Sequence, residues 1–365
     1  MASMRPRPLR FTLPALGLLL LGLVGGARAA TPARPGVPRF SHVVYVVLEN
    51  EDAASTFEAL PSLRALAQQG VYLPHFWAEG HASLDNYQAM WGGVQPTTQG
   101  KADCLGMSYG SCVFPASVPT IAALLDAKRL PWKVYSEGMV GAPLGGDCLH
   151  AVNRSLPDVY QGPLTNGYAT RHNPAPWFDS ILTKGGSEAY CKAHSVDLTQ
   201  LWKDSAALRL PALSFVEPDT CHDGHDTQSL GGCALDPEGP TNPSGTGAIE
   251  AWLPGFVKRL TTSRGWDDHS LLVVTFDEAS TADASGCVPC HDGSAGGRIG
   301  TILLSSLLAK HGTYAGWYGD HYGLLRTWEV AWGLPTLQSK AASPAAASLV
   351  HDGDPGVKPI TGIWR

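Results

Sequence analysis

The chain has 365 residues, of which 44% are hydrophobic and only 16% are charged, so it is long and apolar enough to form a large buried core. Its formal net charge of −6 at pH 7 argues against nucleic acid as a partner, because a nucleic-acid surface is normally basic. An anionic substrate would therefore need local positive charge, which a bound metal ion can supply.

The N-terminal 30 residues have the pattern of a secretory signal peptide. Arg5, Arg7 and Arg10 precede an apolar run that ends in Ala27-Arg28-Ala29, a small-x-small cleavage signal. The apolar run is short for a membrane span of ~20 residues, which disfavours the alternative of an uncleaved anchor. Cleavage would remove four arginines and no acidic residue, leaving 22 basic against 32 acidic residues. We therefore expect residues 31–365 to form a single secreted or periplasmic domain without a stable membrane anchor.

Eight cysteines in an exported chain predict disulfides rather than free thiols. Cys287 and Cys290 could instead bind zinc together with His291, but no second ligand pair follows at zinc-finger spacing, so a disulfide is favoured. The expected pairs are Cys104–Cys112, Cys148–Cys191, Cys221–Cys233 and Cys287–Cys290.

Short apolar runs alternate with amphipathic stretches along the chain. The runs predict strands buried on both faces, which is typical of a parallel sheet, at 42–48, 132–136, 212–216, 270–276 and 300–305. The amphipathic stretches predict helices at 61–69, 83–93, 117–128, 247–262 and 322–334. This alternation predicts an α/β fold, a three-layer α/β/α sandwich with a mostly parallel central sheet.

Acidic residues follow several of the predicted strands. Glu49 and Asn50 follow the first run, Asp219 lies just beyond the third, and Asp277 and Glu278 follow the fourth. A parallel sheet brings these strand ends to one edge, where bare carboxylates would repel one another. Each acid alone could cap a helix or face water, but for the whole set we favour a bound divalent cation.

The stretch "HASLDNY" at 81–87 precedes or begins a predicted helix. Ser83 could be an N-cap residue, which is the usual role of serine there, or a nucleophile at the positive end of the helix dipole. Asn86 lies three positions later, on the same helical face, where its amide could donate a hydrogen bond to a phosphoryl oxygen.

Several stretches together resemble one family. They are "HVVYVVLEN", "HASLDNY", "RHNPAPWF", "PALSFVEPDTCHDGHD", "VVTFDEAS" and "HYGLLRTWEVAWGLP", in this order. In this order they resemble the acid phosphatase and phospholipase C type phosphoesterases of the alkaline phosphatase superfamily. The resemblance extends over nearly the entire mature chain and implies an alkaline phosphatase-like fold.

The resemblance implies a phosphoric ester hydrolase that works through a phosphoserine at Ser83. It implies a divalent metal ion, Mg, Ca, Mn or Zn, at Glu49, Asn50, Ser83, Asp277 and Glu278. Asp219, which follows Glu-Pro as in two-zinc relatives, Asp223 and His321 are candidates for a second metal. Asn86, His81 and His172 are expected to bind substrate, and His81, His225 or His321 to protonate the leaving group.

The leading prediction is a secreted phosphomonoesterase, similar to acid phosphatases, whose partner is a small phosphate ester. A phospholipase C-like phosphodiesterase is the alternative enzyme, although no appended lipid-binding or basic module is visible. A non-catalytic exported binding protein on the same fold is the second alternative. The intact Ser83, Asn86 and strand-end acids argue against it.

Overall fold

A computed structural model describes residues 36–142, 144–150, 167–225, 245–280 and 296–365, all within the unit Ala33–Arg365. The predicted signal peptide therefore lies outside the described residues. So do three of the predicted disulfide cysteines, Cys233, Cys287 and Cys290. No helix in the described part of the chain is long and apolar enough to cross a membrane.

The described residues form an eight-stranded sheet with the order β5-β4-β6-β1-β7-β8-β2-β9. Its strands are β1 His42–Leu48, β2 Val71–Leu73, β4 Trp132–Ser136, β5 Ser195–Asp197, β6 Leu213–Glu217, β7 Ser270–Phe276, β8 Thr301–Leu304 and β9 Gly312–Thr313. A small second sheet pairs β3 Phe76–Trp77 with β10 Gly319–Asp320. In the main sheet, β5, β4, β6, β1 and β7 run parallel.

The mostly parallel α/β fold is confirmed, with one difference in direction. β8 runs antiparallel to both β7 and β2, whereas the apolar run at 300–305 predicts a strand of a parallel sheet. Burial on both faces explains the apolar composition, but burial does not specify strand direction. The central strand β1 is buried from Val43 to Leu48, and Glu49, the residue that follows it, is also fully buried.

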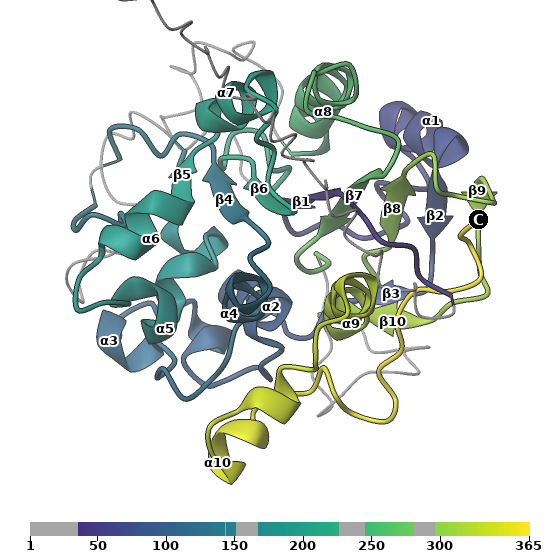
Figure 1. The fold of residues 1–365 in the computed structure, drawn as a ribbon. Coiled ribbons are helices and arrows are strands. Elements are labelled where there is room, and N and C mark those ends of the chain that lie inside the picture. The colour runs from purple at the N-terminus through teal and green to yellow at the C-terminus, as the bar shows by residue number, and fades with distance from the viewer. Residues whose placement is uncertain (1–35, 143, 151–166, 226–244, 281–295) are drawn as a thin grey trace, which may run out of the picture. The chain divides into compact units, whose positions relative to one another are not determined.

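Helices cover both faces of the main sheet (Figure 1). α1 Pro61–Gln69, α7 Thr199–Ala206 and α8 Thr246–Thr261 lie on one face, whereas α2 Ser83–Gly92, α4 Ile121–Ala127 and α9 His321–Trp332 lie on the other. The shorter helices are α3 Tyr109–Cys112, α5 Asp179–Leu182, α6 Ala189–His194 and α10 Pro344–Ala347.

α2 is buried along its entire length, which is unusual for a surface layer and follows from its position between the sheet, α9 and the loops around it. It ends at Gly93, whose φ of 63° is a left-handed conformation that glycine adopts without strain. Two disulfides, Cys104–Cys112 and Cys148–Cys191, fasten the loops on this side of the protein, and Cys221 is also disulfide-bonded.

Candidate active site

Strand order places the predicted acidic residues at one edge of the sheet. β1 lies between β6 and β7, so the residues that follow these three strands are neighbours. The backbone N–H of Asp277 donates to the carbonyl of Leu48 at 2.9 Å, and the N–H of Glu49 donates to the carbonyl of Asp223 at 2.9 Å. The first bond continues the pairing of β1 with β7, and the second joins Glu49 to the turn that follows β6, so Glu49 is fixed between its acidic neighbours.

Ser83 is the first residue of α2, and the N-cap position belongs to Ala82, which makes no side-chain cap. The Ser83 hydroxyl instead donates to Oε2 of Glu49 at 2.8 Å, in a buried position. The hydroxyl group also lies close enough to Asp277 to lower the pKa of that carboxyl. Ser83 is therefore not a capping residue, and its oxygen lies between acids from β1 and β7 at the positive end of a helix.

Two aromatic rings hold the Glu49 carboxylate in place. The Tyr87 hydroxyl donates to Oε1 of Glu49 at 2.5 Å, and Nε2 of His172 lies 3.3 Å from Oε2. The Tyr87 and His172 rings stack with centroids 5.3 Å apart. His172 is buried, which lowers its pKa, so it contacts Glu49 and, at 3.8 Å, Asp223 as a neutral ring. Sequence reasoning missed Tyr87, although it ends the motif that contains Ser83.

Asn50 connects the ends of β1 and β7. Its backbone N–H donates to Oδ1 of Asp277 at 3.1 Å, and its amide Nδ2 donates to Oε1 of Glu278 at 3.0 Å. Asn50 has a φ of 44°, a left-handed conformation that asparagine tolerates better than most residues. The other oxygen of the same carboxyl group, Oε2 of Glu278, lies 2.8 Å from Nδ1 of His81, whose side chain is 44% exposed.

The carboxyl groups at this edge resist ionisation. Burial raises the pKa of Asp277 to about 7, and burial together with the Asp277 charge raises that of Glu278 to about 10. The pKa of Glu49 is also raised, by burial and by the charges of Asp277 and Asp223. A cation in the group would reverse this effect by stabilising the ionised forms.

The donor set fits such a cation. Oδ1 of Asn50 and Oδ2 of Asp277 are buried and accept no hydrogen bond from any described residue. Buried oxygens without a donor are costly, and coordination to a metal ion would satisfy them. Oxygen ligands from carboxylates, an amide and a hydroxyl suit Mg, Ca or Mn.

One protein-family model matches most of this chain. The Phosphoesterase family model matches residues 53–335. The chain belongs to this phosphoesterase family. The family resemblance predicted from the sequence motifs is thereby confirmed.

Curated relatives of this chain include an acid phosphatase of Aspergillus fumigatus, 28% identical over 82% of this chain and 56% of that protein. A phosphatidylinositol-3-phosphatase of Mycobacterium tuberculosis is 25% identical over 96% of this chain and 93% of that protein. The chain thus spans less than two thirds of the fungal acid phosphatases that it matches.

Solved structures are also similar to this chain, at low sequence identity. A protein from a glycosaminoglycan-metabolising locus of Bacteroides thetaiotaomicron has a TM-score of 0.50 and 13% identity, over 88% of this chain and 82% of that one. A protein in the alkaline phosphatase superfamily from Vibrio parahaemolyticus has a TM-score of 0.48 and 14% identity, over 82% and 69%.

The Asn86 amide forms hydrogen bonds with the loop before α2. Its Oδ1 accepts from the N–H groups of Glu79 and Gly80 at 2.9 and 3.2 Å. Its Nδ2 donates to the carbonyls of Gly80 and Ala82, both at 3.1 Å. Asn86 thus shapes the turn that leads into Ser83, and a contact with substrate would require one of these bonds to be exchanged.

The other predicted histidines differ in their surroundings. Nε2 of His321 lies 2.8 Å from the carbonyl of Asp277, and Nδ1 lies 3.5 Å from the Tyr45 hydroxyl. Burial lowers the pKa of His321 to about 4, so it is neutral under ordinary conditions. His225 is exposed, and its backbone N–H donates to Oδ1 of Asp223 at 2.9 Å.

Asp219 lies in a different cluster from Ser83. Its carboxylate, that of Glu137 and the His222 ring have ligand atoms within 4.8 Å of one another. Nδ1 of His222 lies 2.9 Å from Glu137 and 3.4 Å from Asp219, and Trp252 donates to Glu137 at 3.2 Å. Sequence reasoning missed Glu137, although it directly follows β4 as Glu49 follows β1.

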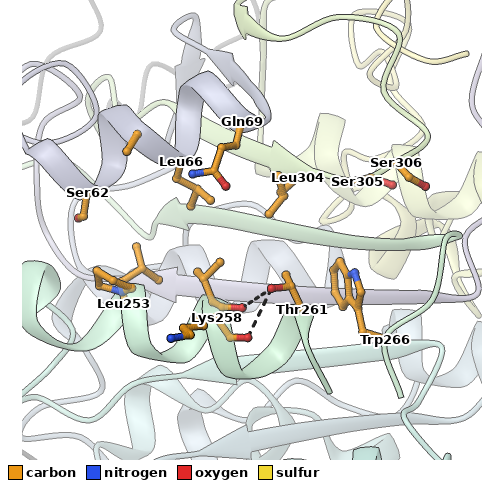
Figure 2. A pocket seen from close by; sticks show the side chains of 13 residues that line it. Ser62, Leu66, Gln69, Leu253, Lys258, Thr261, Trp266, Leu304, Ser305 and Ser306 are labelled. Carbon is orange, nitrogen blue, oxygen red and sulfur yellow. Dashed lines mark hydrogen bonds between the residues drawn. The ribbon is translucent and has the colours of Figure 1, made fainter. Parts of the chain in front are cut away.

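A separate pocket of about 620 Å³ lies between α1 and α8, away from these residues (Figure 2). Leu66, Leu253, Trp266 and Leu304 give it an apolar lining, and Lys258 lies at its side. None of the predicted site residues lines it, so its size does not make it the candidate active site.

Proposed function

We propose that this protein is a metal-dependent phosphoric ester hydrolase that cleaves phosphomonoesters through a phosphoserine at Ser83. The observation that carries the proposal is the 2.8 Å contact between the Ser83 hydroxyl and Glu49, in a group of buried acids at the start of α2. A hydroxyl in this setting has a proton acceptor beside it and a helix dipole that favours an incoming anion.

Glu49, Asn50, Ser83, Asp277 and Glu278 would hold the divalent ion. When bound, the ion supplies positive charge that lowers the pKa of the Ser83 hydroxyl and stabilises the negative phosphoryl oxygens. The two donor-free oxygens of Asn50 and Asp277 support this assignment. The separate cluster of Glu137, Asp219 and His222 is the candidate for a second ion.

Ser83 acts as the nucleophile. Its hydroxyl proton moves to Oε2 of Glu49, its Oγ forms a bond to phosphorus, and the bond from phosphorus to the ester oxygen breaks. Water then gives a proton to His81, which the leaving group has left neutral, and attacks phosphorus from the side of the departed group. The bond from Oγ to phosphorus breaks, and Ser83 recovers its proton from Glu49. Phosphate is released.

His81 is the best placed group to protonate the leaving oxygen. Its ring is 44% exposed, so it can meet substrate, and its Nδ1 lies 2.8 Å from Oε2 of Glu278, which can orient the ring. His321 is less suitable because it is fully buried with a pKa of about 4. His172, also buried, is better suited to orienting Glu49.

A phosphomonoester is the proposed substrate class because the curated relatives bear the names of phosphatases, an acid phosphatase and a phosphatidylinositol-3-phosphatase among them. The second name adds a phosphoinositide head group as a candidate. A phospholipase C-like diesterase is the second candidate function. The two disulfides among the described residues support an exported protein, since such bonds persist in oxidising compartments.

Turnover of three substrates by the metal-loaded protein tests the proposal. We expect an aryl phosphate to be hydrolysed much faster than a bis-aryl phosphate, and phosphatidylinositol 3-phosphate to distinguish a lipid-directed monoesterase from a general one. Preference for the bis-aryl ester would favour the diesterase. No chelator-sensitive turnover of any ester would favour a binding protein.

A further inference from the structure

The segment 97–112 lies against the start of the helix that carries Ser83. A disulfide between Cys104 and Cys112 closes the C-terminal part of this segment, residues 104–112. Oδ1 of Asp103 accepts a hydrogen bond from the backbone N–H of Leu84 at 2.9 Å, and Gln88 donates to the carbonyl of Cys112 at 3.2 Å. Two points along α2 are therefore attached to the same segment, one just before the disulfide-closed loop and one at its end.

The contact between the segment and α2 leaves no room for a side chain. A Cβ added to Gly100 would lie 2.1 Å from Oδ1 of Asp85 and 3.2 Å from Oε1 of Gln88. Asp103 and Cys104 both have left-handed conformations, with φ of 50° and 58°. Because the disulfide begins directly after Asp103, it restrains the backbone that directs the Asp103 carboxylate toward Leu84.

The same carboxylate also reaches a buried guanidinium. Oδ2 of Asp103 lies 3.9 Å from Nε of Arg171, which is 4% exposed. The Arg171 charge is close enough to Glu49 to lower its pKa. Asp103 thus contacts both the first turn of the nucleophile's helix and the buried cation near the nucleophile's partner.

We propose that Asp103 is a positioning residue for Ser83. Its carboxylate accepts from a backbone N–H at the start of α2 that has no partner within the helix, and it lies beside the Arg171 guanidinium, while the Cys104–Cys112 disulfide restrains the adjoining backbone. This inference rests on the proposed phosphoserine chemistry. Because displacement of a reacting group by about 1 Å can cost ~100-fold in rate, loss of this restraint should slow the chemical step.

The test compares kcat and KM for an aryl phosphate in three variants. Asp103→Gly removes the acceptor without straining the left-handed backbone, and we expect it to lower kcat at least about tenfold with KM changed less than about threefold. Asp103→Asn keeps an acceptor and tolerates the same backbone, so it should restore kcat to within about threefold of the natural protein. Hydrogen exchange at the Leu84 amide should be faster in Asp103→Gly.

Asp197→Gly is the matched control, because Asp197 accepts from the Thr199 N–H at the start of α7, also at 2.9 Å. Equal kcat in Asp103→Gly and this control, in a protein that hydrolyses the ester, would overturn the inference alone. No hydrolysis by the natural protein would overturn the proposed function and this inference with it. If Asp103→Gly does not fold, the double variant Cys104→Ser, Cys112→Ser should lower kcat in the same way, and an unchanged kcat would count against the proposal.

Discussion

The Ser83 hydroxyl and the Glu49 carboxylate face each other at 2.8 Å, although 34 residues separate them in the chain. Parallel pairing of β1 with β7 and the burial of α2 produce this meeting. The acceptor, Glu49, is itself fixed by hydrogen bonds from the Tyr87 hydroxyl and through its own backbone N–H, and the His172 ring lies 3.3 Å from it. Both partners are therefore ordered before any substrate arrives, which is the arrangement expected of a reacting group.

Tyr87→Phe should lower kcat by about tenfold while leaving the fold intact. The change keeps the ring that stacks on His172 but removes the hydroxyl that fixes Glu49. An unmade hydrogen bond to a buried charged group costs roughly 1.5–3 kcal/mol, which is one to two powers of ten in rate if it is felt in the transition state. Steady-state kinetics with an aryl phosphate and the melting temperature are the measurements. Tyr45→Phe is a suitable control, because Tyr45 faces His321 rather than Glu49.

Metal ions should raise the melting temperature of the stripped protein. At a concentration 100 times the dissociation constant, a bound ion stabilises the native state by about 2.7 kcal/mol. If the ion lies between the ends of β1 and β7, Asp277→Asn should abolish most of this rise in melting temperature. Glu137→Gln, which alters the separate cluster, should leave it largely intact. The reverse pattern would place the principal ion at Glu137, Asp219 and His222.

Glu329→Gln should flatten the decline of stability at alkaline pH. Burial and the nearby Asp352 raise the pKa of Glu329 from 4.5 to about 10, so the native state keeps a proton that the unfolded chain loses. The contribution of Glu329 to the free energy of unfolding is fully present below pH 4.5. It falls as the pH rises toward 10, by up to about 1.4 kcal/mol per pH unit. Glutamine carries no titrating proton, so it removes this slope.

Melting temperatures between pH 5 and pH 9 check this result. Glu58→Gln is the control, because Arg298 lowers the pKa of Glu58 and both states of the protein carry it ionised throughout that range. An unchanged slope in Glu329→Gln would mean that Glu329 is ionised in the native protein.

Much of the fold could be predicted from the sequence, because long buried strands and helices appear in it as apolar runs and amphipathic stretches. The five predicted strands correspond to β1, β4, β6, β7 and β8, and the five predicted helices to α1, α2, α4, α8 and α9. Short edge strands such as β5 and β9 were missed, since three residues or fewer carry little periodic signal.

The strand-end acids could also be predicted, because their position follows from parallel topology alone. Residues that reach the site from loops could not be predicted in this way. Asp103 reaches α2 only through the folding of a disulfide-closed segment, and no spacing in the sequence indicates that contact. Glu137 did carry a signal, since it follows a predicted strand, but a single acid without a motif around it has many possible roles.

The most direct test of the central claim is to trap the phosphoenzyme. The metal-loaded protein is mixed with an aryl phosphate, quenched in acid within the first turnover, and its phosphorylated peptide is identified by mass spectrometry. We predict one phosphate per chain on Ser83 and none in Ser83→Ala, which should also lose nearly all turnover. Phosphate on another residue, or full turnover in Ser83→Ala, would contradict the account.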